Sequence, residues 1–164
     1  MIIELLLRSV VHPRLRATLL RLLGASIGSN VRIYEGHFMN LDTGFSNLAI
    51  ADDVHIAPGY MFDLKGQIFI GTGSTLSPNV TVMTHADPGS AHNSPLCEMY
   101  PPKTGVVQIG DNCWIGACAT LLCDVRVASG VVVGATSLVR TSIPDAGVYA
   151  GTPVRPIRSY NATL

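Results

Sequence analysis

Aliphatic residues recur every six positions over much of the chain. In the longest run, each aliphatic residue is followed four positions later by a small or β-branched one. The aliphatic positions are Ile109, Ile115, Leu121, Val127, Val133 and Val139, and their partners are Cys113, Ala119, Val125, Val131, Ser137 and Ile143. Shorter runs in the same phase begin at Ile27, Ile50 and Ile70. A period of six fits neither a helix nor a simple alternating strand, so it indicates an internal repeat.

The repeat predicts a solenoid in which each short strand is followed by a corner. Three such steps close one triangular coil, and coils stack at the strand spacing of about 4.8 Å. The aliphatic residue and its partner point inward, because one coil cannot cover its own apolar face and only a stack makes a continuous core. Each buried Ile, Leu or Val contributes about 1.5–3 kcal/mol. Gly, Asn and Asp between the steps suit corners, where φ is often positive.

Length and composition agree with a single domain of this type. Apolar residues make up 48% of the 164 residues, charged residues 13%, and the formal net charge is zero. A neutral chain lacks the basic footprint of a nucleic-acid-binding protein. No run of about 18 apolar residues predicts a membrane-spanning helix, and no cleavable signal sequence is recognisable. We therefore expect a cytoplasmic protein.

The four cysteines match neither a metal-binding motif nor a disulfide framework. Cys113, Cys118 and Cys123 lie five residues apart and form no Cys-x-x-Cys pair. Cys113 occupies an inward position of the repeat, where it is expected to act as a small apolar residue. Cys97 lies in a loop, and no partner signature for a catalytic thiol accompanies it.

The sequence divides into three segments. Residues 1–24 have helical periodicity, with Pro13 suited to a first turn and Gly24 to a stop. Residues 25–147 hold the repeat, and residues 148–164 form a C-terminal tail. The N-terminal helix is expected to cap the open end of the solenoid. Its arginines also support a second interpretation, a basic amphipathic helix on the inner face of the membrane.

One long insertion interrupts the repeat. Val82 and Ile109 are 27 residues apart where one step needs six, so residues 84–107 are expected to form a projecting loop. Such loops often carry function. This loop holds two of the five histidines, His85 at its root and His92. A histidine where the repeat breaks is a candidate general base, because imidazole titrates near neutral pH.

Together these features resemble the hexapeptide-repeat acyltransferases. The resemblance rests on the repeat, the loop rooted at Thr84-His85, the segment Ile-Gly-Asp-Asn-Cys-Trp-Ile-Gly at 109–116 and the ending Tyr-Ala-Gly-Thr-Pro-Val-Arg at 149–155. It is nearest to the sugar O-acetyltransferases of maltose and galactoside type and to acetyltransferases of surface-polysaccharide synthesis. It implies an all-β fold, a left-handed parallel β-helix with a helical cap and a projecting loop. It also implies a homotrimer with active sites between subunits.

The resemblance assigns roles to particular residues, with acetyl-CoA as donor and no metal. His85 would be the general base, oriented by Glu98 or by the nearer Asp87. The backbone N–H of Ala117 would receive the oxyanion, and Trp114 would line the acyl site or pack on a neighbouring coil. Cofactor contacts fall on Gly134, Ala135, Arg140, Thr152, Arg155 and Arg158, and acceptor contacts on Asn47, Asp53 and Met99.

The sequence therefore predicts an acetyl-CoA-dependent O-acetyltransferase that acts on a hydroxyl of a sugar or polysaccharide precursor. N-acetylation of an amino sugar uses the same base and thioester and stays open. A substrate-side Asn of the galactoside type corresponds to Phe45 here, so the acceptor is not carried over. A zinc enzyme resembling the γ-type carbonic anhydrases would need three histidine ligands, and no histidine follows His92. A non-catalytic β-solenoid scaffold would need neither the root histidine nor the Gly-Thr-Pro ending.

Overall fold

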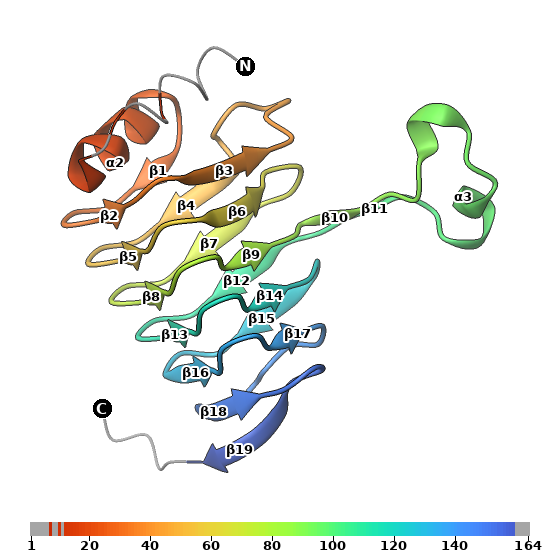
Figure 1. Cartoon of the computed structure of the whole chain (residues 1–164). Helices are drawn as coiled ribbons and strands as arrows, with labels where there is room; N and C mark the ends of the chain where they lie inside the picture. Colours follow the sequence, from red (N-terminus) through yellow and green to blue (C-terminus); the bar gives the residue numbers. More distant parts are fainter. Residues whose placement is uncertain (1–6, 8–9, 11, 160–164) are drawn as a thin grey trace.

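The computed structural model describes Leu7, Val10 and residues 12–159. This part of the chain is a three-sided solenoid with a helix over one end and a hairpin arm projecting from one side (Figure 1). The predicted all-β fold class is confirmed, because stacked parallel sheets form a β-helix with a helical cap and a projecting loop.

Each coil passes through three sheets in turn. Sheet A consists of β1 (Ser26–Ile27), β4 (Leu48–Ile50), β7 (Ile68–Ile70), β12 (Val107–Ile109) and β15 (Val125–Val127). Sheet B consists of β2 (Arg32–Ile33), β5 (His55–Ile56), β8 (Thr75–Leu76), β13 (Trp114–Ile115), β16 (Val131–Val133), β18 (Gly147–Ala150) and β19 (Arg155–Ser159). Sheet C consists of β3 (Gly36–Met39), β6 (Tyr60–Asp63), β9 (Thr81–Val82), β14 (Thr120–Leu121) and β17 (Leu138–Val139). Neighbouring strands come from successive coils and pair in parallel, as Ile27 with Ile50 and Ile50 with Ile70.

The core is one column of side chains inside the solenoid. All twelve inward positions of the longest hexapeptide run are buried, and none is more than 3% exposed. Near the N-terminal end the column holds aromatic rings, where Phe38 packs edge-on against Phe45 at 5.2 Å between centroids. Phe45 is therefore a buried residue of the core.

Helix α2 (Pro13–Leu22) covers the N-terminal end of this column. Pro13 begins the helix as predicted, and the His12 side chain accepts the Leu15 N–H there. Ala17 and Leu20 are buried against β1 and β2. Gly24 follows with φ of 104°, a conformation that favours glycine. The cap predicted from the sequence is thus formed by α2, and most of the chain before residue 12 lies outside the described residues.

The solenoid continues past the predicted start of the tail. In β18, Val148 pairs in parallel with Val132 of β16, so the boundary at residue 148 falls inside a strand. Val132 in turn pairs with Trp114, 18 residues earlier, whereas Val148 follows Val132 by only 16. The last coil is two residues short, so the period of six is lost there. β19 then runs back antiparallel along β18 and ends the described chain.

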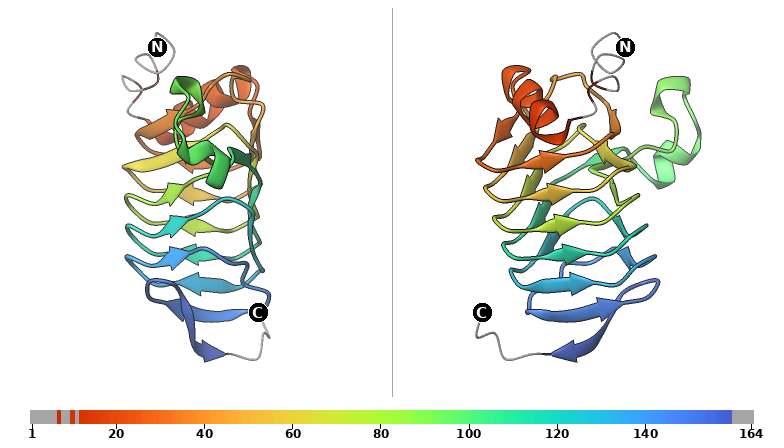
Figure 2. Two further views of the ribbon diagram at one scale, coloured as in Figure 1. Left: turned by 90° about the vertical axis from the view of Figure 1, so that its right-hand side faces the viewer. Right: turned by 60° about the vertical axis from the view of Figure 1, so that its left-hand side comes forward.

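The insertion forms an arm that stands clear of the solenoid in Figure 1 and in the right view of Figure 2. Its root is the antiparallel pair β10 (His85–Ala86) and β11 (Lys103–Thr104). Its tip carries the 3₁₀-helix η1 (Ser90–His92) and the short helix α3 (Leu96–Met99), neither of which has a buried residue. The predicted projecting loop is therefore present, and its tip makes no contribution to the core.

Candidate active site

Most of the predicted catalytic and acyl-site residues lie at two corners of the solenoid. The CA corner joins sheet C to the next strand of sheet A and includes residues 40–47, 64–67, 83–106 and 122–124. The BC corner joins sheet B to sheet C and includes residues 77–80, 116–119 and 134–137. One face of the solenoid separates the two corners. Because each step of the repeat is six residues, this face is at most about 20 Å wide.

His85 lies at the CA corner, where the chain leaves β9 and enters the arm. Its backbone pairs with Thr104 across β10 and β11. Its Nδ1 lies 2.5 Å from Oδ2 of Asp63, the last residue of β6 on the preceding coil. The His85 side chain is 26% exposed, whereas that of Asp63 is fully buried. A buried carboxylate thus binds one ring nitrogen and leaves Nε2 as the free one.

Hydrogen bonds reach both oxygens of Asp63. Oδ2 also accepts the backbone N–H groups of Thr84 and His85, each at 2.9 Å. Oδ1 accepts from Asn40 Nδ2 at 2.7 Å and from the Lys65 N–H at 3.1 Å. Burial alone would raise the pKa of the Asp63 carboxyl, but the hydrogen bonds outweigh it and lower the pKa to about 2. At neutral pH Asp63 is therefore a carboxylate that accepts the His85 Nδ1–H and fixes the ring.

The carboxylate on His85 is Asp63 rather than the predicted Glu98 or Asp87. Glu98 is exposed in α3 at the tip of the arm. Asp87 accepts the backbone N–H groups of Gly89 at 2.8 Å and Ser90 at 2.7 Å within its own turn. The two carboxylates predicted from the sequence are therefore not the one that hydrogen-bonds the His85 ring.

The repeat itself contained a signal for Asp63. Phe62 and Val82 occupy equivalent inward positions on successive coils and are paired across β6 and β9. Asp63 follows the first and Met83 the second, so Asp63 stands one coil above the root of the arm. A polar residue directly after an inward position, one coil from the insertion, is the pattern that identifies it.

A groove of about 420 Å³ lies at the BC corner. It brings together four predicted site residues, namely Trp114, Ala117, Gly134 and Ala135. The Trp114 ring is exposed, and its Nε1 donates to the Ser77 hydroxyl at 2.9 Å. Trp114 therefore forms a wall of this groove, which is otherwise lined largely by apolar and small residues.

Two backbone N–H groups along this groove are unpaired within residues 12–159. They belong to Ala117 and Ala135, which occupy the same position on successive coils. On the coil before them this position holds Pro78, which has no N–H to pair. Unpaired, fixed N–H groups lining a groove suit a substrate carbonyl or an oxyanion.

The remaining cofactor predictions fall at two places. Thr152 Oγ1 donates to the Thr136 carbonyl at 3.3 Å, which puts Thr152 beside the BC corner. Arg155 and Arg158 are exposed on β19, at the C-terminal end of the described chain. Arg140 is exposed after β17, at the end of sheet C away from the BC corner.

The predicted acceptor residues are also spread over the molecule. Asn47 lies at the CA corner and donates to the Leu64 carbonyl at 3.0 Å, a contact between coils. Asp53 lies at the corner joining sheets A and B, where it accepts from Asn30 Nδ2 at 2.7 Å. Met99 is exposed at the tip of the arm. Within one chain, the structure brings only Asn47 to the corner of His85.

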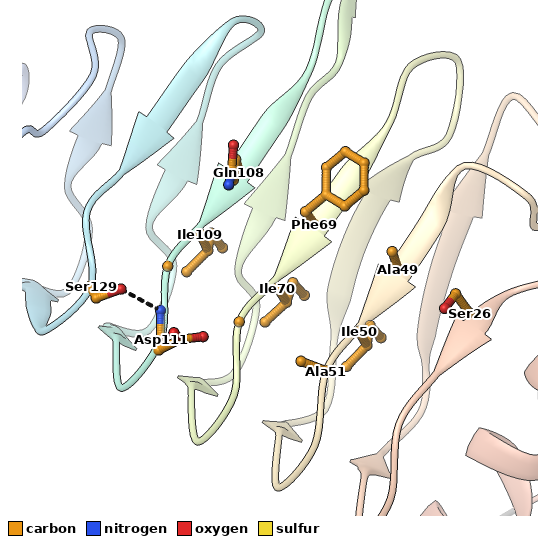
Figure 3. Close-up of a pocket in the computed structure, with 12 residues that line it drawn as sticks. Ser26, Ala49, Ile50, Ala51, Phe69, Ile70, Gln108, Ile109, Asp111 and Ser129 are labelled. Atoms are coloured by element: carbon orange, nitrogen blue, oxygen red, sulfur yellow. Dashed lines mark hydrogen bonds between the residues drawn. The ribbon is translucent and has the colours of Figure 1, made fainter.

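Another groove, of about 360 Å³, lies on the outer face of sheet A (Figure 3). Ser26, Ala49, Phe69 and Gln108 line it from successive strands. The carboxylate of Asp111 at its edge accepts a backbone N–H at 2.8 Å and so stabilises a turn. None of the predicted site residues lines this groove, so the candidate active site stays with the CA and BC corners.

The described residues contain neither a metal-binding cluster nor a membrane-spanning helix. Between residues 12 and 159, no group of three or more His, Cys, Asp or Glu side chains is arranged to hold a metal ion. No helix in the described ranges is long and apolar enough to cross a membrane. Cys113 is buried in the core, as predicted from its inward position.

Similar proteins identify the family. The family model described as Bacterial transferase hexapeptide (six repeats) matches residues 107–141. WbbJ of Escherichia coli (strain K12), named as a candidate O-acetyl transferase of lipopolysaccharide biosynthesis, is 34% identical over 70% of this chain and 59% of its own length. A galactoside O-acetyltransferase of Lactococcus lactis is 32% identical over 93% of this chain and 72% of its own length. A dTDP-4-amino-4,6-dideoxy-D-glucose acyltransferase of Escherichia coli is 30% identical over 85% of this chain and 73% of its own length.

Solved structures share the fold. A hexapeptide-repeat-containing acetyltransferase of Vibrio cholerae has a TM-score of 0.81 at 21% identity, covering 95% of this chain and 85% of that one. A galactoside acetyltransferase solved with coenzyme A has a TM-score of 0.70 at 25% identity, and the match covers 96% of this chain and 77% of that one. The triangular solenoid with its interrupted repeat defines a hexapeptide-repeat protein. By its similarity to these relatives, the chain belongs to the hexapeptide-repeat acyltransferase family. It spans less than two thirds of the length of WbbJ.

Proposed function

We propose that this protein is an acetyl-CoA-dependent O-acetyltransferase that acts on a hydroxyl of a sugar or polysaccharide precursor. The observation that carries the proposal is the pair of His85 and Asp63 at the root of the arm, with a free Nε2 backed by a buried carboxylate. Similarity to a galactoside O-acetyltransferase supports the class of acceptor.

His85 is the general base of this mechanism. Because its Nδ1–H is donated to Asp63, the Nε2 lone pair is free to take the proton of an acceptor hydroxyl while that oxygen attacks the thioester carbon. The Asp63 carboxylate stabilises the resulting imidazolium. The imidazolium then returns its proton to the departing thiolate, which leaves an acetyl ester, a free thiol and a neutral base. Such a base typically contributes about 10²–10⁴-fold.

The BC groove fits the donor. Acetyl-CoA supplies an activated acetyl thioester on a long, flexible arm. The apolar wall at Trp114 suits that arm, and the unpaired N–H of Ala117 receives the oxyanion as the tetrahedral centre forms. One such preorganised donor is worth about 2.7–4 kcal/mol. The N–H of Ala135 and the backbone of Gly134 continue this line of contacts along the corner.

The nucleotide end of the donor is assigned to the C-terminal strands. Thr152 lies next to the BC corner, in line with the groove. Arg155 and Arg158 follow on β19, and an exposed guanidinium is well suited to bind phosphate. Arg140 lies on the other side of sheet C, so it would reach a donor bound to a neighbouring copy rather than to its own BC groove.

A single copy does not complete this site, because His85 and Ala117 lie at different corners. We infer that a second copy turns its BC corner toward the CA corner of the first, and that three copies close a homotrimer. The outer face of sheet C between the two corners supports this contact, because it carries an uncharged column from successive strands. The column consists of Met61, Thr81, Thr120 and Leu138. In such an assembly Glu98 and Met99, at the tip of the arm, would approach the neighbouring copy.

Transfer to the amine of an amino sugar is the alternative. It is favoured by the similarity to a dTDP-4-amino-4,6-dideoxy-D-glucose acyltransferase. The base, the oxyanion donor and the thioester serve both reactions, so the acceptor decides between them. An acceptor panel that contains neutral sugars and amino sugars, with product identification by mass spectrometry, separates the two. The cytoplasmic location stays a prediction.

Replacement of His85 tests the proposed function. With acetyl-CoA and the acceptor panel, His85→Ala is expected to lower turnover by about 10²–10⁴-fold, measured as release of free thiol. The control is His92→Ala, since His92 is exposed on η1 at the tip of the arm. A loss of less than about tenfold in His85→Ala would show that another group is the base.

A further inference from the structure

Helix α2 carries apolar side chains on two opposite faces. Arg16, Ala17 and Leu20 face the solenoid and are buried. Leu15 and Leu22 lie two helical turns apart on the other side, and they are 51% and 78% exposed. We call Leu15, Leu22 and the partly buried Leu19 between them the outer stripe. The cap explains the buried face, but among the described residues it leaves Leu15 and Leu22 exposed to water, where large apolar side chains are unfavourable.

The outer stripe faces away from the solenoid at its N-terminal end. α2 packs on β1 and β2, at the opposite end of the stack from β19 (Figure 1). Because its buried face is turned toward these strands, the opposite face is turned outward. Nothing in the described chain covers it.

Helix α2 itself is basic, although Glu35, Asp52 and Asp53 are exposed on the coils beneath it. Between residues 12 and 34 the sequence holds four arginines and no Asp or Glu. Since the whole chain has 11 basic and 11 acidic residues, the remainder is correspondingly acidic. Arg14 and Arg21 are exposed along one side of the outer stripe. Arg21 Nε donates to the Ile27 carbonyl at 2.9 Å, which holds its charge near the end of the solenoid.

We propose that the outer stripe binds an anionic lipid surface, with α2 lying in the plane of the membrane. An apolar stripe bordered by arginines is the pattern of a helix that inserts its leucines at the acyl boundary and contacts lipid phosphates with its guanidinium groups. Charge complementarity selects this occupant over a second copy of the chain, because two copies would bring their arginines together. The proposal does not depend on acetyl transfer.

The assembly inferred above would strengthen this contact. Three copies related by rotation about an axis along the solenoid present their three α2 helices at the same end. Each contact can then be weak, because the second and third bind at a high effective concentration.

Vesicle flotation of the full-length protein tests the proposal. The wild-type protein is expected to float with vesicles of pure phosphatidylglycerol, to float poorly with vesicles of pure phosphatidylcholine, and to be released by salt. The double substitution Leu15→Gln with Leu22→Gln retains good helix formers. It is expected to weaken binding by about tenfold or more, because two leucines no longer enter the apolar boundary.

Two controls make the result specific. Ile157→Gln changes a side chain that is 65% exposed on β19, at the other end of the solenoid, and should bind vesicles like the wild type. His85→Ala should also bind like the wild type, which separates this proposal from the proposed function. Circular dichroism verifies folding, and Leu22→Gln alone replaces the double variant if that variant unfolds.

Two results would overturn the proposal. The first is equal binding to phosphatidylglycerol by the wild type and the leucine variant, including no binding by either. The second is a leucine variant that changes the oligomeric state in sedimentation while the wild type ignores vesicles, since this would show that a second copy covers the outer stripe.

Discussion

The His85 imidazole depends on a carboxylate that comes from another coil. Asp63 receives hydrogen bonds on both oxygens, and these bonds keep it ionised although it is fully buried. A buried charge that is fully hydrogen-bonded is rigid, because each bond restricts its rotation and loss of any one is costly. In the proposed mechanism, Asp63 therefore determines which nitrogen of His85 is the base.

Asp63→Asn tests this positioning role. The amide is expected to lower kcat by about 10²–10⁴-fold, because it no longer holds the ring in the tautomer that frees Nε2. The KM for acetyl-CoA should stay near the wild-type value, since the donor groove is at the other corner. Asp124→Asn is the matched control, because Asp124 pairs with Lys103 in an exposed contact, and such contacts contribute little. Equal losses in both variants would contradict the role.

Asp63 also predicts a pH dependence of stability. Its pKa is lowered from 3.8 to about 2 in the folded protein, so its stabilising contribution is present above about pH 4 and is lost as the pH falls toward 2. The contribution is on the order of 2 kcal/mol. Urea unfolding across this range should show the difference between wild type and Asp63→Asn shrinking as the pH falls. A difference independent of pH would rule out this linkage.

At the scale of elements, the strands of the repeat supply the buried core, whereas the tip of the arm adds nothing to it. Most strands of the stack contribute one or two inward side chains to a column that is stable only when stacked. The arm contributes no buried residue from η1 or α3. The fold therefore tolerates the arm because its root pairs with itself through β10 and β11 and interrupts no sheet.

The inward positions should carry the stability. Leu121 is fully buried in β14, between β9 and β17. Leu121→Ala is expected to lower the free energy of unfolding by about 2–5 kcal/mol, because it leaves a cavity that neighbouring coils cannot fill. Leu22→Ala, at an exposed position of α2, should change it by no more than about 0.5 kcal/mol. Urea unfolding of both variants checks the contrast, and similar losses would mean that burial in the column is not what stabilises the chain.

At the scale of the whole molecule, the proposed mechanism requires two surfaces that lie at different corners of one chain. His85 and Asp63 form one half of the proposed site at the CA corner. The N–H of Ala117 forms the other half at the BC corner, across a face of the solenoid. A rigid stack of coils cannot fold these corners onto each other, so in the proposed assembly the second half comes from another copy.

Mixing two inactive variants tests this composition. Ala117→Pro removes the oxyanion N–H, and the backbone should accept it because Pro78 occupies the same corner one coil earlier. Each of His85→Ala and Ala117→Pro is expected to be inactive alone. When the two are unfolded and refolded together, some interfaces join an intact His85 to an intact Ala117, so part of the thiol-release activity should return. No recovery, with mixed assemblies verified by mass spectrometry, would place the whole site within one chain.

Much of the architecture can be predicted from the sequence. The inward positions from Ile109 to Ile143 were assigned by period alone, and all are buried. His85 was found because the insertion interrupts that period. The strand β18 was missed because its coil is two residues short, which removes the only signal that marked the others. Asp63 could not be predicted as the partner of His85, because the resemblance pointed to Glu98 and because contacts between coils join residues that are distant in sequence.

The sequence by itself determined that the chain is a triangular solenoid and where its arm begins, because a six-residue period records, in order, which side chains must point inward. Only the tertiary structure decided that Asp63 hydrogen-bonds His85, that the N–H groups of Ala117 and Ala135 are unpaired among residues 12–159, and that no described residue covers the outer stripe of α2. These are properties of surfaces that meet, or fail to meet, when coils stack. A local sequence pattern specifies the surface of one coil, whereas hydrogen bonding and burial depend on the two surfaces that come into contact.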